Sequence, residues 1–195
     1  MPLTAIDPMT ALIVVDLQKG IAIPPTVHSL DAVVSNARDL ASAFRSRDLP
    51  VVLVNVAGGA PGRSDMSPVG KRPEGWTELI SELDPQPSDL RITKFTWGAF
   101  TGTGLYEILT SRDVTQVVLA GIATSMGVES TARQAHELGF NVAVALDAIT
   151  DRIQECHENS VERVFPKISE SGTTAEIISV LDTSRGMQSS THEQN

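Results

Sequence analysis

The sequence predicts an α/β fold in a single domain: a three-layer α/β/α, Rossmann-like, doubly wound sheet that is mostly or wholly parallel. Three observations lead to this fold class. Apolar runs of strand length, rich in β-branched residues, recur along the chain. Amphipathic helical stretches alternate with these runs, as in a parallel sheet with right-handed crossovers. The 195 residues are 41% hydrophobic and 20% charged, which suits one substantial core.

The expected strands are nearly continuous hydrophobic runs, which are typical of strands covered on both faces. A shorter run at 90–94 ends in Lys94. The four longer runs lie at residues 11–16, 51–56, 116–121 and 141–147.

The expected helices lie between these runs and keep apolar residues at helical spacing. Leu49-Pro50 ends the helix expected at 31–48. Gly139 ends the one at 127–138, and Pro166 ends the one at 153–165. Thr173-Thr-Ala-Glu176 announces a last helix, because it forms a capping box in which hydroxyl and carboxylate satisfy each other's backbone donors. The four earlier helices are expected at 31–48, 105–112, 127–138 and 153–165.

The domain is expected to span residues 1–183, followed by a flexible, polar tail at 184–195. Residues 57–91 interrupt the alternation of strands and helices. They hold many of the glycines and prolines and one short helix around 76–83. A connection of this length is usually a functional loop or a disordered one. We favour a loop that covers a substrate.

The composition and net charge argue against two classes of binding partner, nucleic acids and membranes. The net charge is −9 and the basic residues form no run, so we expect no nucleic-acid partner. No apolar run approaches a membrane span, and the start of the chain lacks a signal-peptide pattern, so we expect a cytoplasmic protein without membrane contact. The lone Cys156 excludes an internal disulfide. An inert or partly exposed thiol is the favoured interpretation of this residue.

Three positions at the carboxyl ends of expected strands could carry chemistry, because open α/β sheets bind ligands there. Asp16 ends an apolar strand and is either a general acid or base or a turn cap. Lys94 precedes an apolar, aromatic box and either holds a carboxylate or is merely solvated. The turn at 121–127 opens a helix whose free N–H groups suit an anion, although a tight connection without a ligand would look the same.

Together these positions resemble the isochorismatase-like hydrolase superfamily, which has the cysteine hydrolase fold, over about residues 9–181. The order and spacing of the motifs agree with the resemblance. The segments that carry it are Thr10-Ala-Leu-Ile-Val-Val-Asp16-Leu-Gln, Lys94-Phe-Thr-Trp-Gly-Ala-Phe100, Gly121-Ile-Ala-Thr-Ser-Met-Gly-Val-Glu-Ser-Thr-Ala-Arg133 and Val144-Ala-Leu-Asp147-Ala.

The resemblance implies a role for each motif. The family's catalytic aspartate corresponds to Asp16 and its lysine to Lys94, while the slot of its nucleophilic cysteine holds Gly127. A cis peptide is implied at Ile122-Ala123, and oxyanion donors are implied at the backbone N–H groups of Ala123 and Gly127. True isochorismatases share the glycine, but they typically carry tyrosine, alanine and histidine where this chain has Ala123-Thr124-Ser125.

The expected substrate-binding residues are Ile122, Ala123, Thr124, Trp97 and Phe100. We expect no metal, because the region after the second strand lacks the two histidines of the nicotinamidase branch. We also expect no cofactor, because no phosphate-binding glycine fingerprint follows a strand. The resemblance further implies a homo-oligomer, either a dimer or a tetramer.

Three hypotheses for function remain open. The first is a hydrolase that acts on a small carboxylate- or amide-bearing molecule by Asp16/Lys94 acid–base catalysis, without a covalent thioester. The second is a catalytically silent small-molecule binding or scaffold protein that keeps the hydrolase pocket. The third is an engineered glycine in place of the cysteine of an ordinary amidase.

Overall fold

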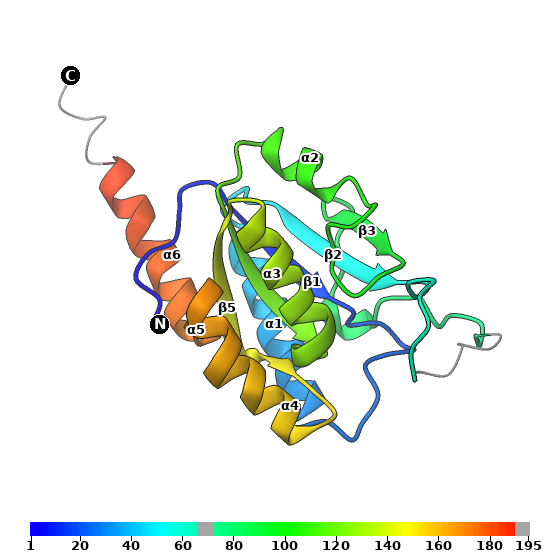
Figure 1. Ribbon diagram of the computed structural model, residues 1–195. Helices are drawn as coiled ribbons and strands as arrows, with labels where there is room; N and C mark the ends of the chain where they lie inside the picture. The colour runs from blue at the N-terminus through cyan, green and yellow to red at the C-terminus, as the bar shows by residue number, and fades with distance from the viewer. Residues whose placement is uncertain (66–71, 190–195) are drawn as a thin grey trace.

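The computed structural model describes residues 1–65 and 72–189 and confirms the expected three-layer α/β/α architecture (Figure 1). Six parallel strands form one sheet in the order β3-β2-β1-β4-β5-β6. The chain therefore winds outward from β1 to one edge and outward from β4 to the other, which makes the sheet doubly wound. The strands are β1 Thr10–Val15, β2 Val51–Val56, β3 Leu90–Lys94, β4 Gln116–Ile122, β5 Asn141–Thr150 and β6 Glu170–Gly172.

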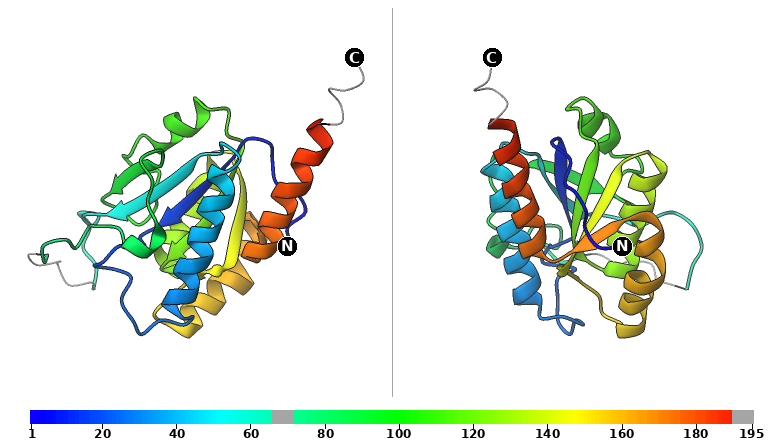
Figure 2. Two further views of the ribbon diagram at one scale, coloured as in Figure 1. Left: turned by 180° about the vertical axis from the view of Figure 1, so that it is seen from behind. Right: turned by 90° about the vertical axis from the view of Figure 1, so that its left-hand side faces the viewer.

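Helices cover both faces of the sheet, as the right-hand view of Figure 2 shows, with α1 and α6 on one side and α3 on the other. Each face has its own apolar cluster, one packed under α1 and α6 and one under α2, α3 and α5. The helices are α1 Leu30–Arg45, α2 Leu105–Thr110, α3 Glu129–Glu137, α4 Gln154–Asn159, α5 Phe165–Ile168 and α6 Thr174–Ser189.

The two central strands have no solvent-facing side. All residues of β1 and β4 are buried. Leu12 and Val14 pack into one cluster, whereas Ala11, Ile13 and Val15 pack into the other. Each buried Val, Leu or Ile contributes about 1.5–3 kcal/mol relative to an exposed one. This two-sided burial explains why the strand sequences are continuous rather than alternating.

Two strands differ from the expectation. β5 continues past Asp147 to Thr150, and the added residues Ala148 and Ile149 are fully buried. β6 is an edge strand of three residues that had no apolar pattern to reveal it. β6 forms because pairing with β5 can extend a sheet where the local sequence gives only a weak signal.

The helix expected to stop at Pro166 instead continues to Ile168. A π-helical turn, Ser160–Val164, precedes α5, so Pro166 lies in the first turn of a new hydrogen-bonding frame. A proline is tolerated there because its missing N–H would have no partner within the helix. A second π-helical turn, Thr124–Val128, joins β4 to α3, so this helical segment begins before residue 127.

The long connection between β2 and β3 packs beside the chain that follows β1. Gln18 pairs with Leu79 in an isolated antiparallel bridge, and the Gln18 side-chain amide donates to the carbonyls of Val56 and Trp76. The short helix expected around 76–83 is a 3-10 turn at Ser81–Leu83. Residues 66–71 of the connection lie outside the described residues.

The expected last helix is present as α6. Its capping box is confirmed, since the Thr173 N–H donates to Glu176 Oε2 over 2.7 Å and the Glu176 N–H donates to Thr173 Oγ1 over 3.2 Å. The backbone of α6 continues to Ser189, so the first part of the expected tail is helical. Residues 190–195 lie outside the described residues.

No helix in residues 1–65 or 72–189 is long and apolar enough to cross a membrane.

Candidate active site

Asp16 directly follows β1, at the point where the winding direction of the sheet reverses. Its φ of 53° places it in the left-handed region, which turns the chain away from the sheet. The backbone N–H still donates to the Val54 carbonyl over 2.9 Å, so the strand pairing continues to this residue. The residue is 5% exposed. A buried carboxylate therefore lies at the ligand-binding edge of the sheet.

Lys94 is the last residue of β3 and is 1% exposed. Because β2 lies between β3 and β1, the Lys94 side chain extends past the end of β2 to reach Asp16. Its ammonium Nζ lies 2.8 Å from Asp16 Oδ2 and also donates to the carbonyl oxygen of Trp97. The structure thus joins two residues that the sequence separates widely, in one buried ion pair.

The two oxygens of the Asp16 carboxyl group have different surroundings. Oδ2 is paired with Lys94, whereas Oδ1 is buried and accepts no hydrogen bond from the residues that the structure describes. Burial raises the pKa of Asp16 to about 6, and the nearby Lys94 only partly opposes this effect. A carboxyl group with this pKa can accept or donate a proton near neutral pH.

The turn after β4 brings the backbone of Gly127 against this ion pair. A Cβ at Gly127 would lie 3.0 Å from Val15 Cγ1, 3.1 Å from Asp16 Oδ2 and 3.2 Å from Lys94 Nζ. Further back, Gly121 has a φ of 121°, and a Cβ there would lie 2.0 Å from the Val15 carbonyl oxygen. Small residues are therefore needed for β4 and its turn to approach the end of β1.

The Ile122–Ala123 peptide is cis, as the resemblance implied. Ile122 is fully buried, and Ala123 packs against the cluster under α1 and α6. Thr124 is fully buried, and its hydroxyl lies 2.9 Å from His157 Nδ1. These three expected site residues therefore lie on the turn itself, next to Gly127.

The two expected aromatic residues lie in different surroundings. Trp97 contacts Lys94 through its backbone carbonyl, while the residue is 53% exposed. Phe100 is 9% exposed, and its ring stacks on Phe140 at 5.8 Å between centroids. The Phe100 ring thus belongs to the core under α3.

Asp151 also shapes the turn, although sequence reasoning missed it. Its Oδ2 accepts the backbone N–H and the hydroxyl of Ser125, each over 2.8 Å, and its Oδ1 accepts the N–H groups of Arg152 and Ile153. Like Asp16, it directly follows a buried run at the carboxyl end of a strand. Extending the expected strand past Asp147 would have revealed it.

His157 and His28 form a second group that sequence reasoning missed. The two rings meet edge to face, with centroids 4.7 Å apart. His28 Nδ1 lies 3.0 Å from the Ile149 carbonyl oxygen. Burial, and to a smaller extent the neighbouring His28, lower the pKa of His157, while Asp151 and Glu158 act in the opposite direction. A neutral imidazole at this position suits a hydrogen bond with Thr124.

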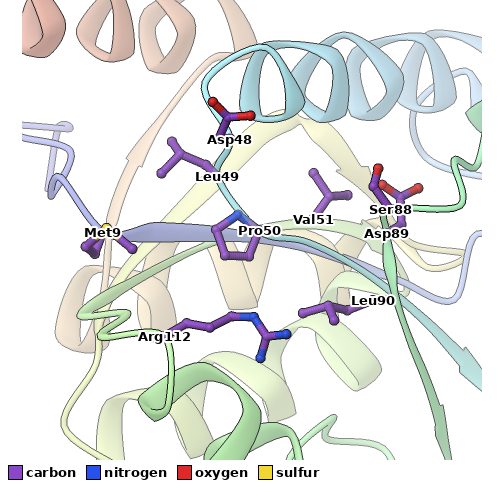
Figure 3. Close-up of a pocket in the computed structure, with 9 residues that line it drawn as sticks. All are labelled: Met9, Asp48, Leu49, Pro50, Val51, Ser88, Asp89, Leu90 and Arg112. Carbon is purple, nitrogen blue, oxygen red and sulfur yellow. The ribbon is translucent and has the colours of Figure 1, made fainter.

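A cavity of about 360 Å³ lies at the other end of the sheet, near the starts of β1, β2 and β3 (Figure 3). Pro50, Leu90 and Arg112 are among the residues that line it. None of its lining residues belongs to the cluster around Asp16, so it is separate from the candidate site. In the described part of the chain, no group of three or more His, Cys, Asp or Glu side chains could hold a metal ion.

The buried ion pair of Asp16 and Lys94 lies at the reversal point of a doubly wound sheet, which is where α/β proteins of this kind bind small molecules. The family model described as the Isochorismatase domain matches residues 10–176. The chain therefore belongs to the isochorismatase family, and it is a hydrolase related to amidohydrolases.

Individual relatives agree with this assignment. An uncharacterized isochorismatase family protein, YecD of Escherichia coli O157:H7, is 41% identical over 88% of this chain and 96% of its own length. The ureidoacrylate amidohydrolase RutB of Pseudomonas syringae pv. syringae is 31% identical over 71% of this chain and 69% of its own length. The solved structure of an isochorismatase family protein from Burkholderia thailandensis has a TM-score of 0.87 and 38% identity, covering 91% of this chain and 98% of that one.

Proposed function

We propose that this hydrolase acts on a small carboxylate- or amide-bearing molecule by acid–base catalysis through Asp16 and Lys94, without a covalent thioester. The observation that carries the proposal is the buried Asp16 carboxyl group, with Oδ2 held by Lys94 and Oδ1 left without a partner among the described residues. A carboxyl group in this state is oriented and can still exchange a proton.

In this proposal, Gly127 occupies the slot of the family's nucleophilic cysteine. A glycine offers no thiol, so the attacking group must be water. Cys156 lies in α4 and is a free, partly buried cysteine. The close approach of Gly127 to Asp16 and Lys94 supports a role for its backbone N–H, together with that of Ala123, in stabilising negative charge.

For an amide substrate, the proposed reaction runs in two steps. The Asp16 carboxylate takes a proton from water as the water oxygen bonds to the carbonyl carbon, and the backbone N–H groups bind the resulting oxyanion. The carbon–nitrogen bond then breaks as Asp16 returns the proton to the leaving nitrogen. Lys94 holds Oδ2 and attracts a substrate carboxylate. The kinship with RutB, an amidohydrolase, supports an amide as the bond that is cleaved.

An Asp16→Asn variant tests the proposal. The substitution keeps the size of the side chain and removes the proton-transferring carboxylate, so turnover should fall at least about 100-fold. Wild type and variant are assayed by mass spectrometry against a panel of amides, esters and vinyl ethers that bear carboxylates. Asp7→Asn is the matched control, because Asp7 bonds Thr115 and Asn141 at the opposite end of the sheet and should leave turnover unchanged.

Two outcomes would overturn the acid–base role. Unchanged turnover in Asp16→Asn would remove Asp16 from the mechanism. Thermal stabilisation of the wild type by panel members, with no product formed, would instead indicate the silent binding protein.

A substrate cover and an oligomer also belong to the proposal. The connection at 57–91 packs against the segment after β1 through Gln18, which supports a covering role near Asp16. The family resemblance supports a homo-oligomer, dimer or tetramer, in the cytoplasm.

A further inference from the structure

Helix α3 is bonded to the segment that follows Lys94. The Ala99 N–H donates to Thr131 Oγ1 over 3.1 Å, and the Phe100 N–H donates to Gln134 Oε1 over 3.0 Å. The Gln134 amide nitrogen in turn donates to Thr101 Oγ1 over 2.6 Å. Two side chains, one helical turn apart, therefore bind three consecutive residues of this segment.

Thr131 also bonds to the turn that carries Gly127. Its hydroxyl donates to the Gly127 carbonyl oxygen over 2.7 Å while the same oxygen accepts the Ala99 N–H. Thr131 is fully buried, so neither bond competes with solvent. A single hydroxyl thus links the segment after β3 to the turn after β4.

Gly98 allows this contact to form. A Cβ at Gly98 would lie 2.2 Å from Gln134 Oε1, so any larger residue would displace the Gln134 amide from its bonds with Phe100 and Thr101. The residue just before it, Trp97, supplies the carbonyl oxygen that accepts a hydrogen bond from Lys94 Nζ. The Trp97 carbonyl therefore lies two residues before the first bond between this segment and α3.

We propose that Thr131 and Gln134 are positioning residues that hold the Trp97 carbonyl against the Lys94 ammonium, and so keep Lys94 on Asp16 beside Gly127. This inference deepens the proposed function and rests on it for its catalytic meaning. Neither side chain touches the reacting groups. They act by fixing one of the two acceptors of the Lys94 ammonium.

A Thr131→Val variant tests the inference. Valine has nearly the same shape but cannot accept the Ala99 N–H or donate to Gly127. A loosened Trp97 carbonyl would let Lys94 move from Asp16, and the titration midpoint of the Asp16 carboxyl carbon should rise by about one pH unit. Carbon-13 NMR of the aspartate carboxyl groups measures this midpoint without a substrate.

Two controls separate positioning from general damage. Thr131→Ser keeps the hydroxyl and should retain the wild-type midpoint. Thr10→Val removes the hydroxyl of another fully buried threonine, which bonds the Gln116 carbonyl over 3.3 Å at the start of β1. This variant should lose stability while the Asp16 midpoint stays unchanged.

An unchanged midpoint in folded Thr131→Val would overturn the inference, because Thr131 would then be a structural residue only. If Thr131→Val fails to fold, Gln134→Met removes the acceptor of the Phe100 N–H, and an unchanged midpoint there has the same meaning. The proposed function fails by a different result, namely unaltered turnover in Asp16→Asn, so the two failures can be told apart.

Discussion

At the scale of single residues, two opposing effects act on Asp16. Removal from water disfavours its charged form, while the ammonium of Lys94 favours it, and the pKa of about 6 shows that removal from water is the larger effect. A carboxylate held by a lysine on a protein surface would stay ionised throughout the neutral range. Here the Asp16 carboxyl group titrates close to neutrality because it is buried.

This balance predicts how stability depends on pH. The folded chain keeps the Asp16 proton up to about pH 6, whereas the unfolded chain releases it near its ordinary value of 3.8. Wild type therefore loses stability as the pH rises through this window. Asp16→Asn carries no such proton, so its free energy of unfolding relative to wild type should rise by about 3 kcal/mol between about pH 4 and about pH 7. Urea denaturation at several pH values measures the difference, and a constant difference would contradict the raised pKa.

Gly127 gives a second prediction at this scale. A Cβ at this position meets three atoms at 3.0–3.2 Å, so Val15, Asp16 and Lys94 must each yield slightly. Such overpacking costs about 1–3 kcal/mol, against a gain of about 1 kcal/mol when alanine replaces glycine in a helix. Gly127→Ala and Gly127→Cys should therefore both unfold at lower urea concentration than wild type.

The comparison of Gly127→Ala with Gly127→Cys also tests whether Gly127 replaces the cysteine of an ordinary amidase. The proposed water-dependent mechanism predicts that Gly127→Cys gains no amidase activity over Gly127→Ala. A large gain, together with a covalent acyl-enzyme detected by mass spectrometry, would favour an ordinary amidase whose cysteine had been replaced.

At the scale of elements, the ends of strands and helices decide the site, and these are the parts that sequence patterns define least well. Continuous apolar runs identified β1, β2 and β4 because both of their faces are buried. Asp16 could be predicted because it ends such a run, and Lys94 because it ends the short run at 90–94 directly before an apolar, aromatic box. Asp151 was not predicted, because the expected strand ended at Asp147, before the buried Ala148 and Ile149 that lead to it.

The π-helical turns were also beyond prediction. Their hydrogen-bonding frame depends on tertiary contacts, such as the bond between Ser125 and Asp151, and leaves no periodic signal in the sequence. Likewise, no local pattern shows that Thr131 bonds Ala99, since thirty-two positions separate them along the chain.

Asp151 predicts a measurable link between β5 and the turn after β4. Its two oxygens accept four donors, so Asp151→Asn leaves at least one of them unpaired and should lower the free energy of unfolding by about 2 kcal/mol. Asp147→Asn is the matched control. One oxygen of Asp147 accepts both donors from Thr174, and an asparagine can retain that oxygen. Equal losses in urea denaturation would contradict the special role of Asp151.

At the scale of the whole molecule, the strand order explains why distant residues meet. β1 and β4 are adjacent, so the chain after each strand leaves the sheet at the same edge, and β3 lies close enough for a lysine to cross. Alternation of strands and helices predicted the layers and the parallel direction. The position of the edge strand β6 and the placement of the 57–91 connection required the assembled sheet, because both depend on contacts between parts far apart in the chain.

The left-handed backbone at Asp16 has a practical consequence for interpreting mutants. Aspartate and asparagine are the side chains, besides glycine, that most readily adopt this conformation, whereas alanine is penalised by about 1–2 kcal/mol. In an Asp16→Ala variant, a loss of turnover could thus come either from a distorted main chain or from the missing carboxylate. Asparagine adopts the left-handed conformation without this penalty. A loss of turnover in Asp16→Asn therefore reports on the carboxylate itself.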